Sequence, residues 1–394
     1  MLNSLPPVFA VQNGFCLYEL MISISETEVK SKKHTLFFLF YPPPGSELFH
    51  VLSGAAFPGL LCSAANSFLL SIGKTIPGFG VADLPFSIYH EEKLLQEITA
   101  MQVSISNSFL HITAQTEGAE LQSIRSADGT EYLWQGDPAY WEGRSPTLFP
   151  YVARLTDGKY YLDGSVHQMR IHGFAPYSVF RLASCTDTEI TFELSDTPES
   201  LIQYPRSFVF RIIYRLEEKT LFIRYEVANT DDRTLYFGLG GHPGFRVPNV
   251  TGKSFESYRL RFSESSEPVR IGFSEDCFRD GTETAFPLEN GTILSLTHSL
   301  FDDDAIVLKN VAREVILEAE GDEHSVTVRY PQMPYLGLWH APKTTAPYLC
   351  IEPWCSLPSE KGKVSVFEKQ NDLIRVLPKE QYLNEWSICF GMPD

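Results

Sequence analysis

Basic residues are scarce in this chain of 394 residues, which has 32 lysines and arginines against 49 aspartates and glutamates. The formal net charge is −17, and no basic stripe interleaved with aromatic residues is present. Nucleic-acid binding needs clustered lysine and arginine to neutralise phosphates. The composition therefore disfavours a nucleic-acid partner and favours a small neutral ligand, or one that is clamped locally.

Cysteine is also sparse, with seven residues scattered along the chain and no C-x-x-C pair. The odd number and the scatter are atypical of a disulfide framework, and the first residues do not read as a cleavable signal sequence. We therefore expect reduced thiols and a cytoplasmic protein.

The motifs of several enzyme classes are missing. There is no P-loop and no G-x-S-x-G elbow, and in "GLGGHP" Pro243 occupies the place of the third glycine of a dinucleotide fingerprint. His167 and His172 are five residues apart in "HQMRIH". In an extended segment this odd spacing turns them to opposite faces, which argues against joint metal binding. We expect neither a metal nor an organic cofactor.

The composition changes near residue 100. Residues 48–73 are free of charge and long enough to span a bilayer, but His50, Pro58, Asn66 and many serines and glycines make a poor membrane helix. We expect residues 1–100 to be an N-terminal extension without a membrane role. It is either loosely packed or translated from upstream of the natural start, because Met101 opens the regular part of the chain.

From Met101 onward the pattern is that of β-strands. "EITFELSD", "SFVFRIIYRL" and "REVILEAE" alternate apolar and polar residues, and turns such as "ADGT", "LEEKT" and "NTDDR" separate such segments. No long helical period, fixed repeat or linker interrupts this rhythm. The sequence predicts an all-β fold, with one large β-sandwich domain over residues 101–394.

Four residues in this domain are candidates for chemistry. His242, among the glycines of "GLGGHPGF", could exchange protons near neutral pH or be an idle loop histidine. Glu352, in the apolar run "YLCIEPWCSLP", lies either on a solvated strand face or in a buried functional position. His172 in "RIHGF" could be a structural imidazole, and Arg154, just before a D-G turn, could be a surface arginine.

Six segments taken in order resemble the aldose 1-epimerase (galactose mutarotase) family, particularly its compact bacterial branch. They are "GAELQSIRSADGTEYLWQGDPAYW", "LFPYVARL", "HGFAPYSVF", "GLGGHPGFRVP", "DDDAIVLKN" and "CIEPWCSLP". The resemblance covers about residues 101–391. It implies a large β-supersandwich with a carbohydrate cleft across one sheet, and conversion between the α and β anomers of an aldose.

The resemblance also implies roles for individual residues. The family's general acid falls on His242 and its general base on Glu352. The histidine that contacts the sugar near its ring oxygen falls on His172, and a substrate-binding arginine falls on Arg154.

The aspartate that binds sugar hydroxyls falls on Asp304, with Asp302 and Asp303 as alternatives of register. Two positions depart from the family pattern. Ala153 stands where relatives often have glycine, and Pro176 stands where the family's "HGFAR" would supply an arginine. The second departure puts a phosphate-binding role of that arginine in doubt.

These residue types suit the reaction, in which only protons move and the ring opens and recloses. A carboxylate base and an imidazolium acid on opposite sides of the sugar are sufficient. Ordinary pKa values of about 4.3 for glutamate and about 6.5 for histidine make Glu⁻ with HisH⁺ the natural working pair. A nearby carboxylate should also raise the histidine pKa toward neutrality.

Two alternative functions stay open. A hexose-6-phosphate 1-epimerase would need a basic clamp, to which Arg144, Arg154, Lys159 and Arg170 could contribute, although Pro176 and the acidic composition count against it. A non-catalytic sugar-binding or regulatory protein would not need both an acid and a base. The sequence leaves the particular aldose and the oligomeric state open.

Overall fold

The computed structural model describes residues 21–22, 35–39, 51–55, 101–249 and 252–391, and it divides the chain into two compact units, residues 1–89 and 90–394. Among the described residues of the first unit are three short antiparallel strands: β1 (Met21–Ile22), β2 (Thr35–Leu39) and β3 (Val51–Ala55). Apart from these strands, the expectations for residues 1–100 concern residues outside the described ranges. No helix in the described ranges is long and apolar enough to cross a membrane.

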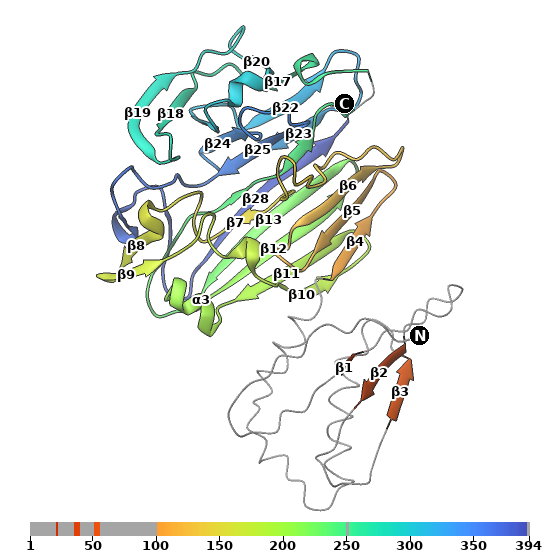
Figure 1. Ribbon diagram of the computed structural model, residues 1–394, viewed down its shortest axis with the longest axis vertical. Coiled ribbons are helices and arrows are strands. Elements are labelled where there is room, and N and C mark those ends of the chain that lie inside the picture. The colour runs from red at the N-terminus through yellow and green to blue at the C-terminus, as the bar shows by residue number, and fades with distance from the viewer. Residues whose placement is uncertain (1–20, 23–34, 40–50, 56–100, 250–251, 392–394) are drawn as a thin grey trace, which may run out of the picture. The chain divides into compact units, whose positions relative to one another are not determined.

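The second unit is built around two large antiparallel sheets (Figure 1). The first has nine strands, in the spatial order β10 (Arg181–Cys185), β11 (Glu189–Ser195), β12 (Phe208–Glu217), β13 (Thr220–Asn229), β28 (Gln381–Phe390), β23 (Val326–Arg329), β22 (Glu314–Ala319), β17 (Tyr258–Phe262) and β20 (Ile293–Ser295).

The second large sheet has eight strands and carries Glu352 on its central strand β25 (Tyr348–Trp354). Its order is β19 (Arg279–Ala285), β18 (Val269–Phe273), β21 (Ile306–Lys309), β24 (Tyr335–Trp339), β25 (Tyr348–Trp354), β15 (Gly240–Gly241) and β7 (Thr147–Leu148), and β16 (Gly244–Arg246) also pairs with β25.

Smaller elements complete the unit. They are the sheet of β4 (Gln102–Ser106), β5 (Leu110–Gln115) and β6 (Leu121–Ser126), the sheet of β26 (Ser365–Val366), β8 (Lys159–Leu162) and β9 (Ser165–Gln168), the pair β14 (Leu235–Phe237) and β27 (Ile374–Val376), the helix α3 (Pro198–Gln203), and the 3₁₀ turns η2 (Thr156–Gly158), η3 (Ala175–Tyr177), η4 (Phe255–Ser257), η5 (His298–Phe301) and η6 (Phe367–Lys369).

Buried and more exposed side chains alternate strictly along the long strands of the nine-stranded sheet. In β12, Phe208, Phe210 and Ile212 are buried and the residues between them are only half-buried; β13 shows the same alternation. Successive side chains of a strand point to opposite faces, so one face of each strand enters the core. The all-β sandwich predicted from the sequence is confirmed.

Strand β25 differs because every residue from Tyr348 to Trp354 is buried. It pairs with β24 along one edge and with β15 and β16 along the other. Glu352 is therefore buried, and the alternative of a solvated strand face for this residue does not apply.

The glycines of "GLGGHPGF" do not adopt left-handed backbone conformations, so they are not required for a turn. They are required for close packing. A Cβ atom on Gly241 would lie 2.6 Å from the indole ring of Trp386, and one on Gly238 would lie 2.3 Å from Oγ of Ser356. Glycine thus lets this segment lie directly against its neighbours and bring His242 beside β25.

Candidate active site

A cleft of about 1170 Å³ opens at the eight-stranded sheet. All five residues that the resemblance implicates line it: Arg154, His172, His242, Asp304 and Glu352. They come from five separate segments, so the fold brings together the residues predicted from separate motifs.

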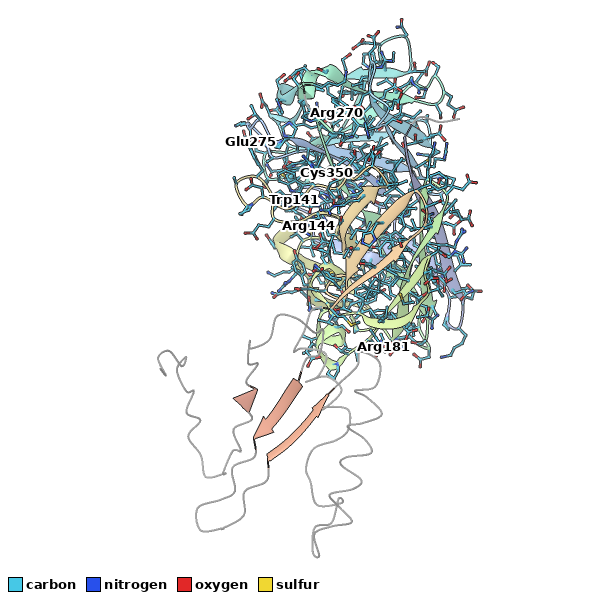
Figure 2. The ribbon with its side chains drawn as sticks, turned by 90° about the vertical axis from the view of Figure 1, so that its right-hand side faces the viewer. Trp141, Arg144, Arg181, Arg270, Glu275 and Cys350 are labelled. Carbon is cyan, nitrogen blue, oxygen red and sulfur yellow. The ribbon has the colours of Figure 1, made fainter. Side chains whose placement is uncertain are left out.

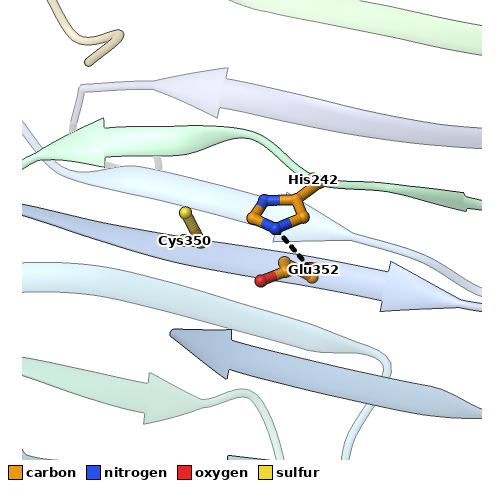
Figure 3. Close-up of side chains that lie close together, drawn as sticks. All are labelled: His242, Cys350 and Glu352. Atoms are coloured by element: carbon orange, nitrogen blue, oxygen red, sulfur yellow. Dashed lines mark ion pairs between the residues drawn. The ribbon is translucent and has the colours of Figure 1, made fainter. Parts of the chain in front are cut away.

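His242 and Glu352 are in direct contact at the floor of the cleft (Figure 3). The distance between His242 Nε2 and Glu352 Oε2 is 3.3 Å, and the residues are only 8% and 1% exposed. The strand register explains the contact. Gly240 pairs with Trp354 and Gly244 with Cys350, which places His242 opposite Glu352. The two groups therefore touch, whereas the sequence analysis expected them on opposite sides of a sugar.

Burial changes the protonation of this pair in a direction that the sequence analysis did not expect. It lowers the pKa of His242 well below its usual range, and the neighbouring His172 lowers it further. Burial raises the pKa of Glu352 well above its usual range, and the negative charge of Asp304 adds to the rise. A carboxyl group that is itself neutral cannot raise the histidine pKa. Burial therefore favours neutral imidazole with protonated carboxyl.

Aromatic rings enclose His242 on two sides. Trp141 stacks on its ring at a centroid distance of 4.9 Å and an angle of 27°, and Trp339 meets it edge-on at 5.8 Å. Both tryptophans line the cleft. They remove water from the imidazole and offer apolar faces of the kind that cover a sugar ring.

His172 is held by the backbone of Ala153. The amide N–H of Ala153 donates to Nδ1 of His172 at 3.2 Å, and the His172 N–H donates to the Ala153 carbonyl at 3.0 Å. Neutral His172 must then carry its proton on Nε2. Burial, with the charge of Arg154 in addition, lowers the pKa of His172 to about 4, so it is neutral at pH 7. His167 lies apart on β9 and does not line the cleft.

The Ala153 backbone is left-handed, with φ of 57°. Glycine adopts this conformation most readily, so the alanine at this position is held in a backbone conformation that costs energy.

Arg154 follows directly and is exposed, but its charge reaches the His172 ring and it lines the cleft. The structure thus places the arginine at the cleft wall.

Asp304 is the most firmly held of the three consecutive aspartates. Its Oδ1 accepts a hydrogen bond from Nε1 of Trp339 at 2.7 Å, and its Oδ2 accepts one from Sγ of Cys277 at 2.8 Å. Asp302 and Asp303 also line the cleft. The structure gives them no such side-chain bonds within its described ranges, which favours Asp304 among the three.

The sequence analysis did not identify Trp141, Trp339, Cys277 or Cys350 as parts of the site. Trp141 ends one of the recognised segments, and Cys350 lies two residues before Glu352 on the same strand face, so both positions carried a signal. Figure 2 shows Trp141 and Cys350 near one another, with Glu275 and Arg270 towards one end of the domain and Arg181 at the far end. Cys277 and Trp339 meet Asp304 only through tertiary folding.

Cys350 lies close enough to the catalytic candidates to suggest a metal site. Ligand atoms of His242, Cys350 and Glu352 lie within 4.8 Å of one another (Figure 3). However, burial raises the pKa of the Cys350 thiol well above its usual range, and the thiolate is the form that binds metal. A cation bound at this cluster would have to displace the thiol proton.

Of the four basic residues considered for a phosphate clamp, Arg154 lines the cleft and the other three do not. Among the described residues, Arg144 donates to the side chain of Gln122 at 2.6 Å, and Arg170 stacks over the ring of Tyr177. Neither these two nor Lys159 lines the cleft.

The family model for aldose 1-epimerase matches residues 101–385. This chain belongs to the aldose 1-epimerase family. The family match begins at Met101, where the regular β pattern of the sequence begins, and the resemblance noted from the motifs is confirmed.

Two kinds of relatives support the family assignment. The chromosomal protein LacX of Lactococcus lactis is 31% identical over 301 residues, which cover 73% of this chain and 99% of LacX. A galactose mutarotase related enzyme from Lactobacillus acidophilus is 31% identical, with a TM-score of 0.70 over 74% of this chain and 98% of the enzyme. A galactose mutarotase-like protein from Lactobacillus casei is 28% identical with the same TM-score, over 74% of this chain and all of that protein.

Proposed function

We propose that this member of the aldose 1-epimerase family interconverts the α and β anomers of an unphosphorylated aldose by acid–base ring opening. The observation that carries the proposal is the buried contact of His242 and Glu352 on the floor of a cleft. C1 of a pyranose carries both the anomeric oxygen O1 and the ring oxygen O5. Two groups in contact below C1 can therefore serve both oxygens, without lying on opposite sides of the ring.

The opening step starts from the ionised form of the pair, in which the shared proton has passed from Glu352 to His242 across their contact. Glu352 then removes the proton from O1 and His242 gives a proton to O5. The C1–O5 bond breaks, O1 becomes the aldehyde oxygen, and the pair is left as neutral imidazole and protonated carboxyl. Burial favours this neutral form, so the cleft stabilises the open-chain state. Each positioned proton transfer contributes about 10²- to 10⁴-fold to the rate.

Ring closure restores the pair. After rotation about C1–C2, the O5 hydroxyl attacks the other face of C1, His242 takes back the proton of O5, and Glu352 returns a proton to O1. Protons balance over the cycle, and no cofactor enters any step. Arg154, Asp304 and the Nε2–H of His172 position the sugar during both steps.

The charge of the cleft supports an unphosphorylated substrate. Its lining includes the cations Arg154, Arg270 and Lys343. Against these stand the acidic residues Glu275, Asp280, Asp302, Asp303 and Asp304 of the same lining. A phosphate group brings up to two negative charges, which this lining repels unless the cations are clustered on it.

Polarimetry tests the proposal. Freshly dissolved α-anomers of glucose, galactose and related aldoses should lose optical rotation faster with the protein than without it, and hexose 6-phosphates should respond less. Glu352→Gln serves as the matched control because it keeps the shape of the side chain. Sugar binding by calorimetry without faster mutarotation would instead support the sugar-binding alternative.

A further inference from the structure

The hairpin of β18 and β19 forms part of the cleft wall and contacts Asp304, a proposed sugar ligand. Its turn carries Cys277, whose Sγ lies 2.8 Å from Oδ2 of Asp304. The same aspartate receives the Trp339 indole N–H on its other oxygen. Each carboxylate oxygen thus has one donor, and the two donors come from different parts of the cleft wall.

The backbone around the thiol is held in place. The N–H of Cys277 donates to the Ser274 carbonyl at 2.9 Å, and the N–H of Ser274 donates to the Phe278 carbonyl at 2.9 Å. Cys277 and Asp304 have left-handed φ values of 63° and 73°. Such conformations cost energy for residues other than glycine and persist where the surrounding contacts enforce them.

We infer that Cys277 is a positioning residue for the aldose: its thiol donates to Asp304 and orients that carboxylate toward the sugar hydroxyls. The inference rests on the proposed function, because Asp304 binds sugar only if the cleft does. A carboxylate rotated away from its two donors could not present the same lone pairs to a hydroxyl pair. The thiol stays in its donor form, because burial and the Asp304 charge raise the pKa of Cys277 to about 11.

The kinetic test compares two substitutions. Cys277→Ala should raise KM about 3- to 10-fold, the range expected for losing a weak hydrogen bond to a charged group, with kcat changed less than KM. Cys277→Ser, which keeps a donor, should return KM to within about twofold of the original value. Cys185→Ala, at an exposed cysteine on β10, is the matched control and should leave KM unchanged.

A chemical test is independent of turnover. The rate of Cys277 alkylation by iodoacetamide, followed by peptide mass spectrometry, should rise at least about threefold in Asp304→Asn, because the loss of the charge lowers the thiol pKa. Asp302→Asn, which changes a neighbouring cleft carboxylate that does not contact the thiol, should leave the rate unchanged. Equal rates in both variants would overturn the inference whether or not the protein has epimerase activity.

The two hypotheses can fail separately. If the protein binds sugars without turnover, the proposed function fails, and the inference is tested by whether Cys277→Ala weakens sugar affinity in calorimetry. An unchanged affinity or KM in Cys277→Ala, with unfolding temperature preserved, overturns the inference. So does a Cys277→Ser variant that is as impaired as Cys277→Ala.

Discussion

Replacing Glu352 by glutamine should lower kcat at least about 10²-fold while the fold is kept, since the amide preserves shape but cannot accept the proton. Glu352 is only 1% exposed and its pKa is raised, so the amide replaces a largely neutral group. The thermal unfolding temperature should therefore change little. A kcat within about threefold of the original value, measured by polarimetry at saturating sugar, would remove Glu352 from the mechanism.

The contact of 3.3 Å between His242 and Glu352 makes the prediction sharper. Residues that act as one unit give non-additive losses. His242→Asn alone should also lower kcat by about 10²-fold or more, and the double variant should be little worse than either single variant. If the two losses multiply in the double variant, His242 and Glu352 act independently and the paired mechanism is wrong.

The pH profile gives a second measure of the same pair. The active pair holds one transferable proton. Activity should therefore fall at low pH, where His242 also binds a proton, and at high pH, where Glu352 loses its proton. Because the pKa of His242 is lowered and that of Glu352 is raised, the acid limb should lie below the ordinary pKa of histidine and the alkaline limb above the ordinary pKa of glutamate. The apparent values belong to the pair. The alkaline limb should flatten in Glu352→Gln, and an intact alkaline limb there would contradict this assignment.

Three further substitutions test the surroundings of the site and the fold. Arg154→Ala should raise KM and lower kcat in steady-state kinetics through poorer positioning, and unchanged kinetics would restore its reading as a surface residue. Gly241→Ala should destabilise the protein by about 1–3 kcal/mol in thermal unfolding, because the new Cβ lies 2.6 Å from the Trp386 ring; an unchanged unfolding temperature would contradict the close packing. The bonds of His324 to Asp128 and Asp322 raise its pKa, so its stabilising contribution is present below its ordinary pKa and is lost as pH rises through the raised value. In urea unfolding at several pH values, His324→Gln should remove that part of the pH dependence, and a profile identical to the original would refute the assignment.

The all-β fold could be predicted from the sequence because its long strands bury only one face. Alternation in β12 and β13 directly reports which side chains enter the core. The same signal failed at β25, where both faces are covered and alternation disappears. The choice between a solvated and a buried Glu352 therefore required the tertiary structure.

Local motifs drew attention to His242, Glu352 and His172, and the structure brings all three to the cleft. The contact of Cys277 with Asp304 joins residues 27 positions apart, and no local pattern records it. The directions of the pKa shifts of His242 and Glu352 could not be predicted from the sequence either, because they depend on burial by Trp141 and its neighbours rather than on residue type.

The strand pairing that places His242 beside Glu352 separates two kinds of evolutionary change. A register slip of one residue along β25 would present Ile351 or Pro353 in place of the carboxyl and abolish the chemistry. The wall around Cys277 belongs to a hairpin outside that pairing, so it can accept substitutions without shifting the acid or the base. Under the proposed function, preference for one sugar over another can therefore drift among descendants of this protein while the acid–base pair is preserved.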